Sequence, residues 1–295
     1  NEEEIVEKTF SVLEEELKNI EHEIIFVNDG SKDKTREILE KLLLQTPHNK
    51  LVNFSRNFGH QAAFSAGIDK AEGDAVVIID GDLQDPPALI HAMLEKWREG
   101  YQVVYAQRRK RKGETFFKKF TAYAFYRCFA KLTNIEIPPD TGDFRLMDRV
   151  VVDHLKNLPE RSRFLRGLVC WVGFKKIGVF YDRAERTAGK SKYPFRKMFR
   201  LAFDGITGFS SAPLKISFSV GCLSTLLAMA LFIWTILEKI LTPETTVPGW
   251  ASLMTAIVFL GGVQLISIGI LGEYIGRIYE EVKQGPLYIE DKSGK

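Results

Sequence analysis

The 295-residue sequence has few cysteines and little net charge, and each shortage excludes a class of protein. Its three cysteines, Cys128, Cys170 and Cys222, have neither paired nor metal-ligand spacing, which is typical of a reducing compartment and argues against a zinc site. A net charge of +3 gives no reason to expect a nucleic-acid partner. Neither a G-x-G-x-x-G fingerprint nor a Walker loop is present, so dinucleotide oxidoreduction and P-loop phosphoryl transfer have no support.

The apolar residues are concentrated in the last third of the chain. Two uncharged runs, 216–237 and 250–272, are each long enough to cross a hydrocarbon core, and the segment between them contains Pro243 and Pro248. We therefore expect a transmembrane hairpin rather than two buried core helices. Basic residues flank its outer ends, whereas the connecting loop has only Lys239. The positive-inside rule then predicts a multi-pass protein of the plasma membrane with both termini in the cytoplasm.

The part before the hairpin has the pattern of an α/β domain. Apolar strand patterns alternate with helical ones, which predicts a mainly parallel sheet that binds its ligand at the carboxyl ends of the strands. The expected strands are 23–27, 51–54, 75–79 and 102–106, and the expected helices are 34–44, 61–71 and 87–97. Because the chain opens on a helical pattern directly after Asn1, a leading strand is expected to be missing.

Three further segments have the pattern of basic amphipathic helices with aromatic stripes, as found at membrane surfaces. The segment 194–205 adjoins the first apolar run and is predicted to lie at the interface, and 273–283 follows the second run. For 113–132, packing on the domain with a solvated basic face is equally favoured. The expected division is a cytoplasmic domain at 1–193, a juxtamembrane helix at 194–212, a hairpin at 213–272, and a cytoplasmic helix with tail at 273–295.

The strand 75–79 ends in a cluster of carboxylates, Asp80-Gly81-Asp82-Leu83-Gln84-Asp85. Hard oxygen ligands at the rim of a sheet are typical of a Mg²⁺ or Mn²⁺ ion that carries a phosphate. Asp and Gly are also ordinary turn residues, so this motif alone is weak evidence.

Several motifs stand in order along nearly the whole chain and together resemble those of inverting GT-A glycosyltransferases of family 2. The resemblance is to the polyprenyl-phosphate sugar transferases related to dolichol-phosphate mannose synthase, and the two-span tail narrows it to the GtrB-like branch. The motifs are Asn1-Glu2-Glu3, Val27-Asn28-Asp29-Gly30-Ser31, Ser55-Arg56-Asn57-Phe58-Gly59, Asp80-Gly81-Asp82-Leu83-Gln84-Asp85-Pro86-Pro87, Asp140-Thr141-Gly142-Asp143-Phe144-Arg145-Leu146 and Ala188-Gly189-Lys190-Ser191-Lys192-Tyr193.

The resemblance implies a Rossmann-like GT-A domain that transfers a hexose to polyprenyl phosphate, such as undecaprenyl phosphate, at the cytoplasmic face. Glucose from UDP-glucose is the expected donor, although these motifs fix neither the hexose nor the nucleobase. A homo-oligomer such as a tetramer is expected. A processive polysaccharide synthase is the enzymatic alternative, but the region that would carry its Q-x-x-R-W signature, 163–168, has no tryptophan. A non-catalytic scaffold that binds nucleotide sugar or lipid is the other alternative.

On the donor side, the resemblance and the chemistry assign the metal to Asp82, with Asp80 and Gln84 close by. Asp29 is expected to accept hydrogen bonds from the base, or alternatively to close a turn and cap a helix. The remaining donor-binding residues are expected to be Glu2, Gly81 and Arg108.

On the acceptor side, Asp143 is the expected catalytic carboxylate, which takes a proton or orients the attack. The acceptor phosphate is already largely a dianion, so Asp143 can instead position the acceptor, or it can be a helix cap. The cations expected at the phosphates are Arg186 and Lys192, with Lys119 and Arg145 as weaker candidates. The segment 184–193 is expected to be a loop that closes over the substrates.

Overall fold

The computed structural model describes residues 1–44, 46–109, 138, 141–161, 163–182, 206–241 and 249–292. The chain divides into two units, of which the first contains Asn1–Ala202 with Gln284–Lys295 and the second contains Phe203–Lys283. The segments 113–132, 184–193 and 194–205, for which the sequence predicts helices and a closing loop, lie outside the described residues.

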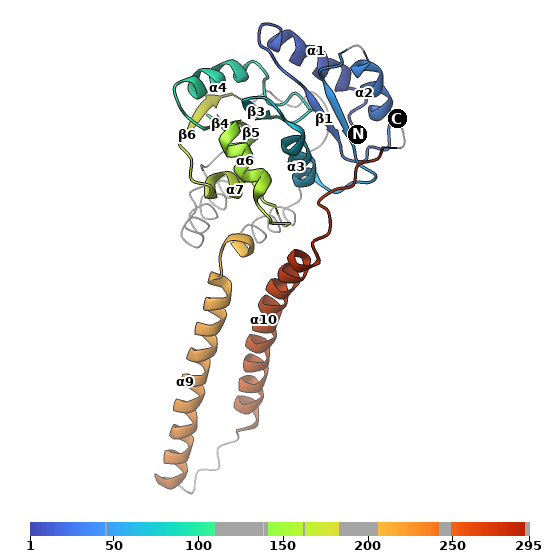
Figure 1. Ribbon diagram of the computed structural model, residues 1–295. Coiled ribbons are helices and arrows are strands. Elements are labelled where there is room, and N and C mark those ends of the chain that lie inside the picture. The colour runs from blue at the N-terminus through green and yellow to red at the C-terminus, as the bar shows by residue number, and fades with distance from the viewer. Residues whose placement is uncertain are drawn as a thin grey trace. The chain divides into compact units, whose positions relative to one another are not determined.

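The first unit begins with a parallel pair of strands among three helices. Strands β1 (Ile25–Asn28) and β2 (Lys50–Asn53) are joined by α2 (Thr35–Leu43), as the strand–loop–helix pattern predicts. Helix α1 (Val6–Leu17) contacts α2, and α3 (His60–Lys70) packs on β1. Helix α2 also contacts both strands, so that helices pack on this small sheet (Figure 1).

A second sheet of four strands has the order β3-β5-β4-β6. Strands β4 (Val103–Arg108) and β6 (Lys176–Tyr181) are parallel, whereas β5 (Thr141–Asp148) runs antiparallel between β4 and β3 (Ala75–Ile78). The α/β class is confirmed, but the sheet is mixed rather than mainly parallel. The reason is the antiparallel strand β5, which is buried from Thr141 to Met147. Its first residues are polar, so the sequence pattern does not indicate a strand there.

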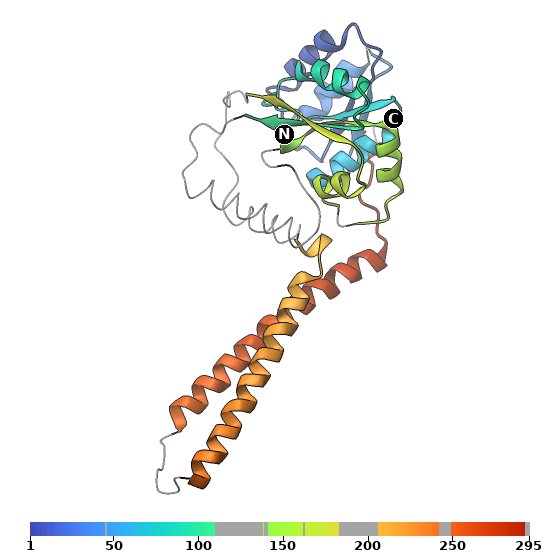
Figure 2. The same ribbon diagram turned by 90° about the vertical axis from the view of Figure 1, so that its left-hand side faces the viewer.

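Helices cover both faces of the second sheet. Helix α4 (Leu89–Arg98) contacts β4, β5 and β6 on one side, and α6 (Arg149–Asn157) contacts β3 and β5 on the other, with α7 (Leu165–Trp171) against α6 (Figure 2). Central β5 supplies Phe144, Leu146 and Met147, which are almost completely buried. Burial of such side chains stabilises a fold by about 1.5–3 kcal/mol each, so β5 contributes strongly to the stability of the core.

The segment after the last helix packs back on the first unit. Ile289 O accepts a hydrogen bond of 3.0 Å from Ser55 N, and Asp291 N donates to Asn53 O at 2.7 Å. Glu290 forms an antiparallel bridge with Phe54. The tail thereby pairs with the chain at the end of β2, from Asn53 to Ser55, and satisfies backbone groups there that would otherwise be open to strand pairing.

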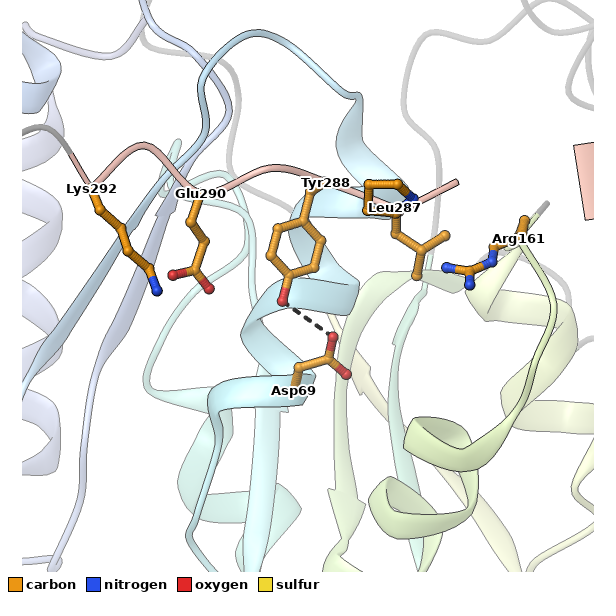
Figure 3. A pocket seen from close by; sticks show the side chains of 7 residues that line it. Asp69, Arg161, Leu287, Tyr288, Glu290 and Lys292 are labelled. Atoms are coloured by element: carbon orange, nitrogen blue, oxygen red, sulfur yellow. Dashed lines mark hydrogen bonds between the residues drawn. The ribbon is translucent and has the colours of Figure 1, made fainter. Parts of the chain in front are cut away.

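Side chains hold the tail in place as well. The Tyr288 ring stacks on Phe54 with centroids 4.8 Å apart, and its hydroxyl donates to Asp69 on α3 at 3.3 Å (Figure 3). Burial, the largest influence, and the neighbouring Asp69 raise the pKa of Tyr288 to about 12. A pocket along this tail is lined by Asp69, Arg161, Pro286, Leu287, Tyr288, Glu290 and Lys292. None of the carboxylates after β3 contributes to it.

The second unit is a helical hairpin of α9 (Ala212–Leu241) and α10 (Trp250–Lys283), which contact each other (Figure 1). Both helices are long and apolar enough to cross a membrane. Large apolar side chains such as Phe218, Leu226 and Leu265 are exposed along them. Residues 273–283, predicted as a separate amphipathic helix, continue α10 without a break. At about 1.5 Å per residue, this helix of 34 residues exceeds the thickness of a hydrocarbon core of about 30 Å.

Candidate active site

Acidic residues follow the strands β1 and β3 and also lie on β5. Asp29 follows β1, Asp80 and Asp82 follow β3, and Asp143 lies on the neighbouring β5. His60, the first residue of α3, connects the last two groups, because its Nε2 lies 3.3 Å from Asp143 Oδ2 and 3.6 Å from Asp80 Oδ1. Ionised carboxylates only accept hydrogen bonds, so this nitrogen carries a proton.

Asp29 organises the loop in front of α3. Its carboxylate accepts hydrogen bonds from Phe58 N at 2.7 Å, from Gly59 N at 3.0 Å and from Asn57 Nδ2 at 2.8 Å. The turn after Asp29 needs glycine, since Gly30 has φ +65° and a Cβ there would lie 2.5 Å from the carbonyl carbon of Arg56. The alternative role expected for Asp29 was to close a turn and cap the next helix, α2. Its carboxylate instead binds backbone N–H groups at the start of α3.

The carboxylates after β3 form a tight turn. Asp82 Oδ1 accepts from Gln84 N at 3.1 Å, and Leu83 between them has a left-handed φ of 53°. Thr9 of α1 donates to Gly81 O at 2.9 Å and fixes the turn from the other side. This conformation leaves the second oxygen of Asp82 without a hydrogen bond among the described residues.

The electrostatics of this turn fit a divalent cation. Burial is the main cause that raises the pKa of Asp80, and although His60 opposes it, the charges of Asp143 and Asp82 add to the rise. Negative charge is therefore in excess around Asp80. A cation relieves that excess, and carboxylate and amide oxygens are the ligands that Mg²⁺ and Mn²⁺ prefer. Asp80, Asp82 and Gln84 together offer such a donor set.

Asp143 is buried and held by two hydrogen bonds from Arg166 of α7. Arg166 Nε lies 2.7 Å from Asp143 Oδ1, and its Nη2 lies 2.7 Å from Oδ2. Burial by itself would raise the pKa of Asp143, but the hydrogen bonds from Arg166 and His60 hold it well below the usual range. Asp143 is therefore an ionised carboxylate with little tendency to take a proton, in contrast to the requirement for a general base near neutral pH.

The third acid of the motif, Asp85, is part of the core. It is 1% exposed, accepts a hydrogen bond from the Tyr181 hydroxyl of β6, and lies 3.9 Å from Arg108 Nη2. Arg108 Nε donates to the same hydroxyl at 3.2 Å. These contacts fix Arg108 at the carboxyl end of β4, beside the Asp143 strand, where a Cβ on Gly142 would lie 3.3 Å from its Nη2.

The other expected site residues have varied positions. Arg145 is buried and donates to the carbonyls of Gly142 and Asp143, at 2.9 and 3.2 Å, so its guanidinium supports β5. Glu2 is exposed, and its backbone N donates to Thr35 Oγ1 at 2.9 Å, near the loop after Asp29. Lys119, Arg186 and Lys192 lie outside the described residues.

Sequence reasoning did not single out His60 or Arg166. Both had an available signal: His60 directly follows the Ser55-Arg56-Asn57-Phe58-Gly59 motif, and Arg166 lies in the segment that was compared with Q-x-x-R-W. Their contacts with Asp143 join residues 83 and 23 positions apart, which only the fold reveals.

Comparison with known proteins agrees with this geometry. The uncharacterized glycosyltransferase YkcC of Bacillus subtilis (strain 168) is 52% identical over 99% of this chain and 91% of its own length. An uncharacterized glycosyltransferase of Synechocystis sp. is 54% identical over 98% of this chain and 91% of its own length. The SfII prophage-derived bactoprenol glucosyl transferase of Shigella flexneri is 45% identical over 99% of this chain and 95% of its own length.

Two family patterns divide the chain as its structure does. Residues 212–278 match the GtrB C-terminal hairpin, which comprises most of α9 and α10. Residues 1–156 match glycosyl transferase family 2, and this segment contains the site carboxylates Asp29, Asp80, Asp82, Asp85 and Asp143. The chain is thus a member of glycosyl transferase family 2 that carries a GtrB-type C-terminal hairpin.

Proposed function

We propose that this protein transfers glucose from UDP-glucose to a polyprenyl phosphate, such as undecaprenyl phosphate, with inversion at the sugar carbon. The observation that carries the proposal is that His60 contacts both Asp80 and Asp143, close in sequence to Asp82, in a family 2 chain with a GtrB-type hairpin. The names of relatives that are bactoprenol glucosyl transferases support the sugar and the acceptor.

On the donor side, Asp82, Asp80 and Gln84 would hold Mg²⁺ or Mn²⁺. When bound, the ion supplies positive charge that stabilises the nucleoside diphosphate as it leaves. Asp29 and Glu2 would contact the nucleotide, and Asp29 also keeps the loop before α3 in its shape. Arg108, rigidly held by Tyr181, would face the phosphates from the end of β4.

On the acceptor side, we assign Asp143 a positioning role rather than that of a strong base. Arg166 occupies both carboxylate oxygens, and the pKa of Asp143 is held low. The acceptor needs little help to lose a proton, because the second ionisation of a monoalkyl phosphate lies near pH 6. The ionised Asp143 and its cationic partners would instead fix where the phosphate oxygen attacks.

Cations outside the described residues belong to this proposal as well. Arg186 and Lys192 would bind phosphate groups, and Lys119 is a further candidate on the same chemical grounds. Arg145 is a poorer candidate, since its guanidinium is buried against backbone carbonyls.

The hairpin would keep the site close to the bilayer that contains the lipid acceptor. The chain enters α9 from the first unit, and α10 leads into a tail that packs on that same unit, so both ends of the hairpin are tied to one domain. This connectivity supports an even number of membrane crossings. The excess of basic residues at these ends supports a cytoplasmic domain, and a homo-oligomer such as a tetramer stays part of the proposal.

The test is a screen of nucleotide sugars with the purified full-length protein, undecaprenyl phosphate, and either Mg²⁺, Mn²⁺ or EDTA. The proposal expects a lipid-linked sugar from UDP-glucose that requires metal and is absent with Asp82→Asn. A polymer would support the processive alternative, and binding of UDP-glucose without release of UDP would support the scaffold.

A further inference from the structure

Three potential metal ligands meet at the end of the first sheet that is opposite to Asp29. Glu14 lies on α1, His22 in the loop before β1, and His48 in the loop before β2. Because β1 and β2 are parallel, with Ile25 opposite Lys50, the two preceding loops emerge at the same edge. One nitrogen from each histidine and one oxygen of Glu14 lie within 4.8 Å of one another.

The orientation of His22 is fixed in the manner of a metal ligand. Its Nδ1 lies 2.7 Å from Ile20 O, and since a carbonyl only accepts, Nδ1 carries the ring proton. The neutral ring then presents a lone pair at Nε2. That atom is buried and has no hydrogen-bond partner among the residues that the structure describes, which is costly for a polar group. Such an Nδ1–H to carbonyl bond commonly supports metal-binding histidines.

Glu14 is oriented in a similar way. Asn49 Nδ2 donates to Glu14 Oε1 at 2.7 Å, and Asn49 is itself fixed because its Oδ1 accepts from Ile24 N at 2.8 Å. Glu14 Oε2 is 3.7 Å from His22 Nε2, too far for a hydrogen bond, and Oε1 is 4.0 Å from His48 Nε2.

These separations are close to those of a tetrahedral zinc site. Zinc bonds of about 2.0–2.2 Å place two ligands of a tetrahedron about 3.3–3.6 Å apart. The nearest oxygen–nitrogen distances, 3.7 Å from Glu14 Oε2 to His22 and 4.0 Å from Oε1 to His48, are slightly longer and involve different oxygens of Glu14. A side-chain rotation must therefore bring a single oxygen to both rings. The His48 side chain is 51% exposed and can close the gap by rotating, whereas His22 is only 15% exposed and would be the anchor.

We propose that Glu14, His22 and His48 bind Zn²⁺, with water as the fourth ligand. Two imidazoles and one carboxylate favour zinc over Mg²⁺, which prefers oxygen ligands only. The cysteine spacing argued against zinc, but none of these ligands is a cysteine. The ion joins α1 to both loops at the edge away from the carboxylates, so it stabilises the first unit and takes no part in transfer.

The test is a Zn²⁺ titration by calorimetry of metal-free full-length protein in detergent, with saturating Mg²⁺ to occupy the oxygen site. The proposal expects one equivalent of tightly bound Zn²⁺ in the wild type, in Asp82→Asn and in the matched control His154→Gln. His22→Gln and His48→Gln should lose it. Co²⁺ should give the intense visible bands of tetrahedral coordination in the wild type, and these should disappear in both histidine variants.

Two outcomes would overturn the proposal. In the first, the wild type binds no Zn²⁺, so that the three side chains are neighbours without a shared ligand. In the second, Asp82→Asn loses the bound equivalent while the histidine variants keep it. His48→Gln keeps the test decisive if His22→Gln fails to fold, because the exposed His48 side chain can be replaced with little effect on packing.

Discussion

The pair of Arg166 and Asp143 should be strongly coupled, and a double-mutant cycle can measure this. The Asp143 side chain is 8% exposed and that of Arg166 is 27% exposed. Removing one partner of a buried ion pair typically costs about 3–5 kcal/mol. We expect about 3 kcal/mol for Arg166→Met, because among the described residues the buried carboxylate then keeps His60 and the more distant Arg145 as neighbours.

The reverse change should cost less. With Asp143→Asn the guanidinium of Arg166 can turn toward solvent, so a loss of about 1–2 kcal/mol is expected. In the Asp143→Asn background, Arg166→Met should add less than about 1 kcal/mol, because no buried charge is left unpaired. The resulting coupling energy is about 2 kcal/mol.

The assay is thermal unfolding of the full-length protein in detergent, followed by tryptophan fluorescence. For a unit of this size, about 3 kcal/mol corresponds to a lowering of the melting temperature by about 6–12 °C. The matched control is the exposed pair Lys96 and Glu99, whose side chains are 37% and 51% exposed. Its coupling should stay below about 0.5 kcal/mol. Additive losses at Arg166 and Asp143, as at the control pair, would refute the reasoning.

Three further predictions concern Asp82, Gly30 and Tyr288. Asp82→Asn should abolish metal-dependent transfer without lowering the melting temperature, while Asp153→Asn, an exposed carboxylate away from the site, should leave transfer unchanged; residual metal-dependent activity in the first variant contradicts the donor assignment. Gly30→Ala should destabilise the first unit by about 2 kcal/mol or more, because Gly30 has a φ of +65° and the new Cβ would lie 2.5 Å from the Arg56 backbone. The control Gly67→Ala in α3 should be neutral or stabilising, and equal melting temperatures for the two variants would contradict the prediction. Tyr288 should titrate with a pKa of about 12, measured as the absorbance difference between the wild type and Tyr288→Phe. Because its pKa in the folded protein is raised from 10, its contribution to tail docking should be present below pH 10 and lost between pH 10 and 12, and a midpoint near 10 would show an undocked tail.

Elements with a strong local pattern could be predicted from the sequence. The helices α2, α3 and α4 were expected from their local pattern, and the hairpin from the length of its two uncharged runs. Strand β5 could not be predicted in this way, because Thr141, Asp143 and Arg145 interrupt the apolar run. In the fold these polar groups are satisfied by Pro138 O, by Arg166 and by backbone carbonyls, which local pattern does not contain.

For the same reason, the candidate site could be predicted from the sequence only in part. Asp29, Asp80 and Asp82 stand at strand ends, where sequence alone indicates a ligand site. The state of Asp143 depends on Arg166 and His60, which reach it from other helices. The docking of the tail is still more distant in sequence, since Arg36 and Asp291 are 255 positions apart. Contacts of this kind follow from packing, and no periodicity records them.

The central claim is tested most directly by the mass and anomeric configuration of the product formed from UDP-glucose and undecaprenyl phosphate with Mg²⁺ or Mn²⁺. The account predicts a lipid phosphate that carries one hexose in β linkage, inverted from the donor, together with release of UDP. An α-linked product, a chain of several hexoses, or no lipid-linked sugar with any nucleotide sugar would contradict it.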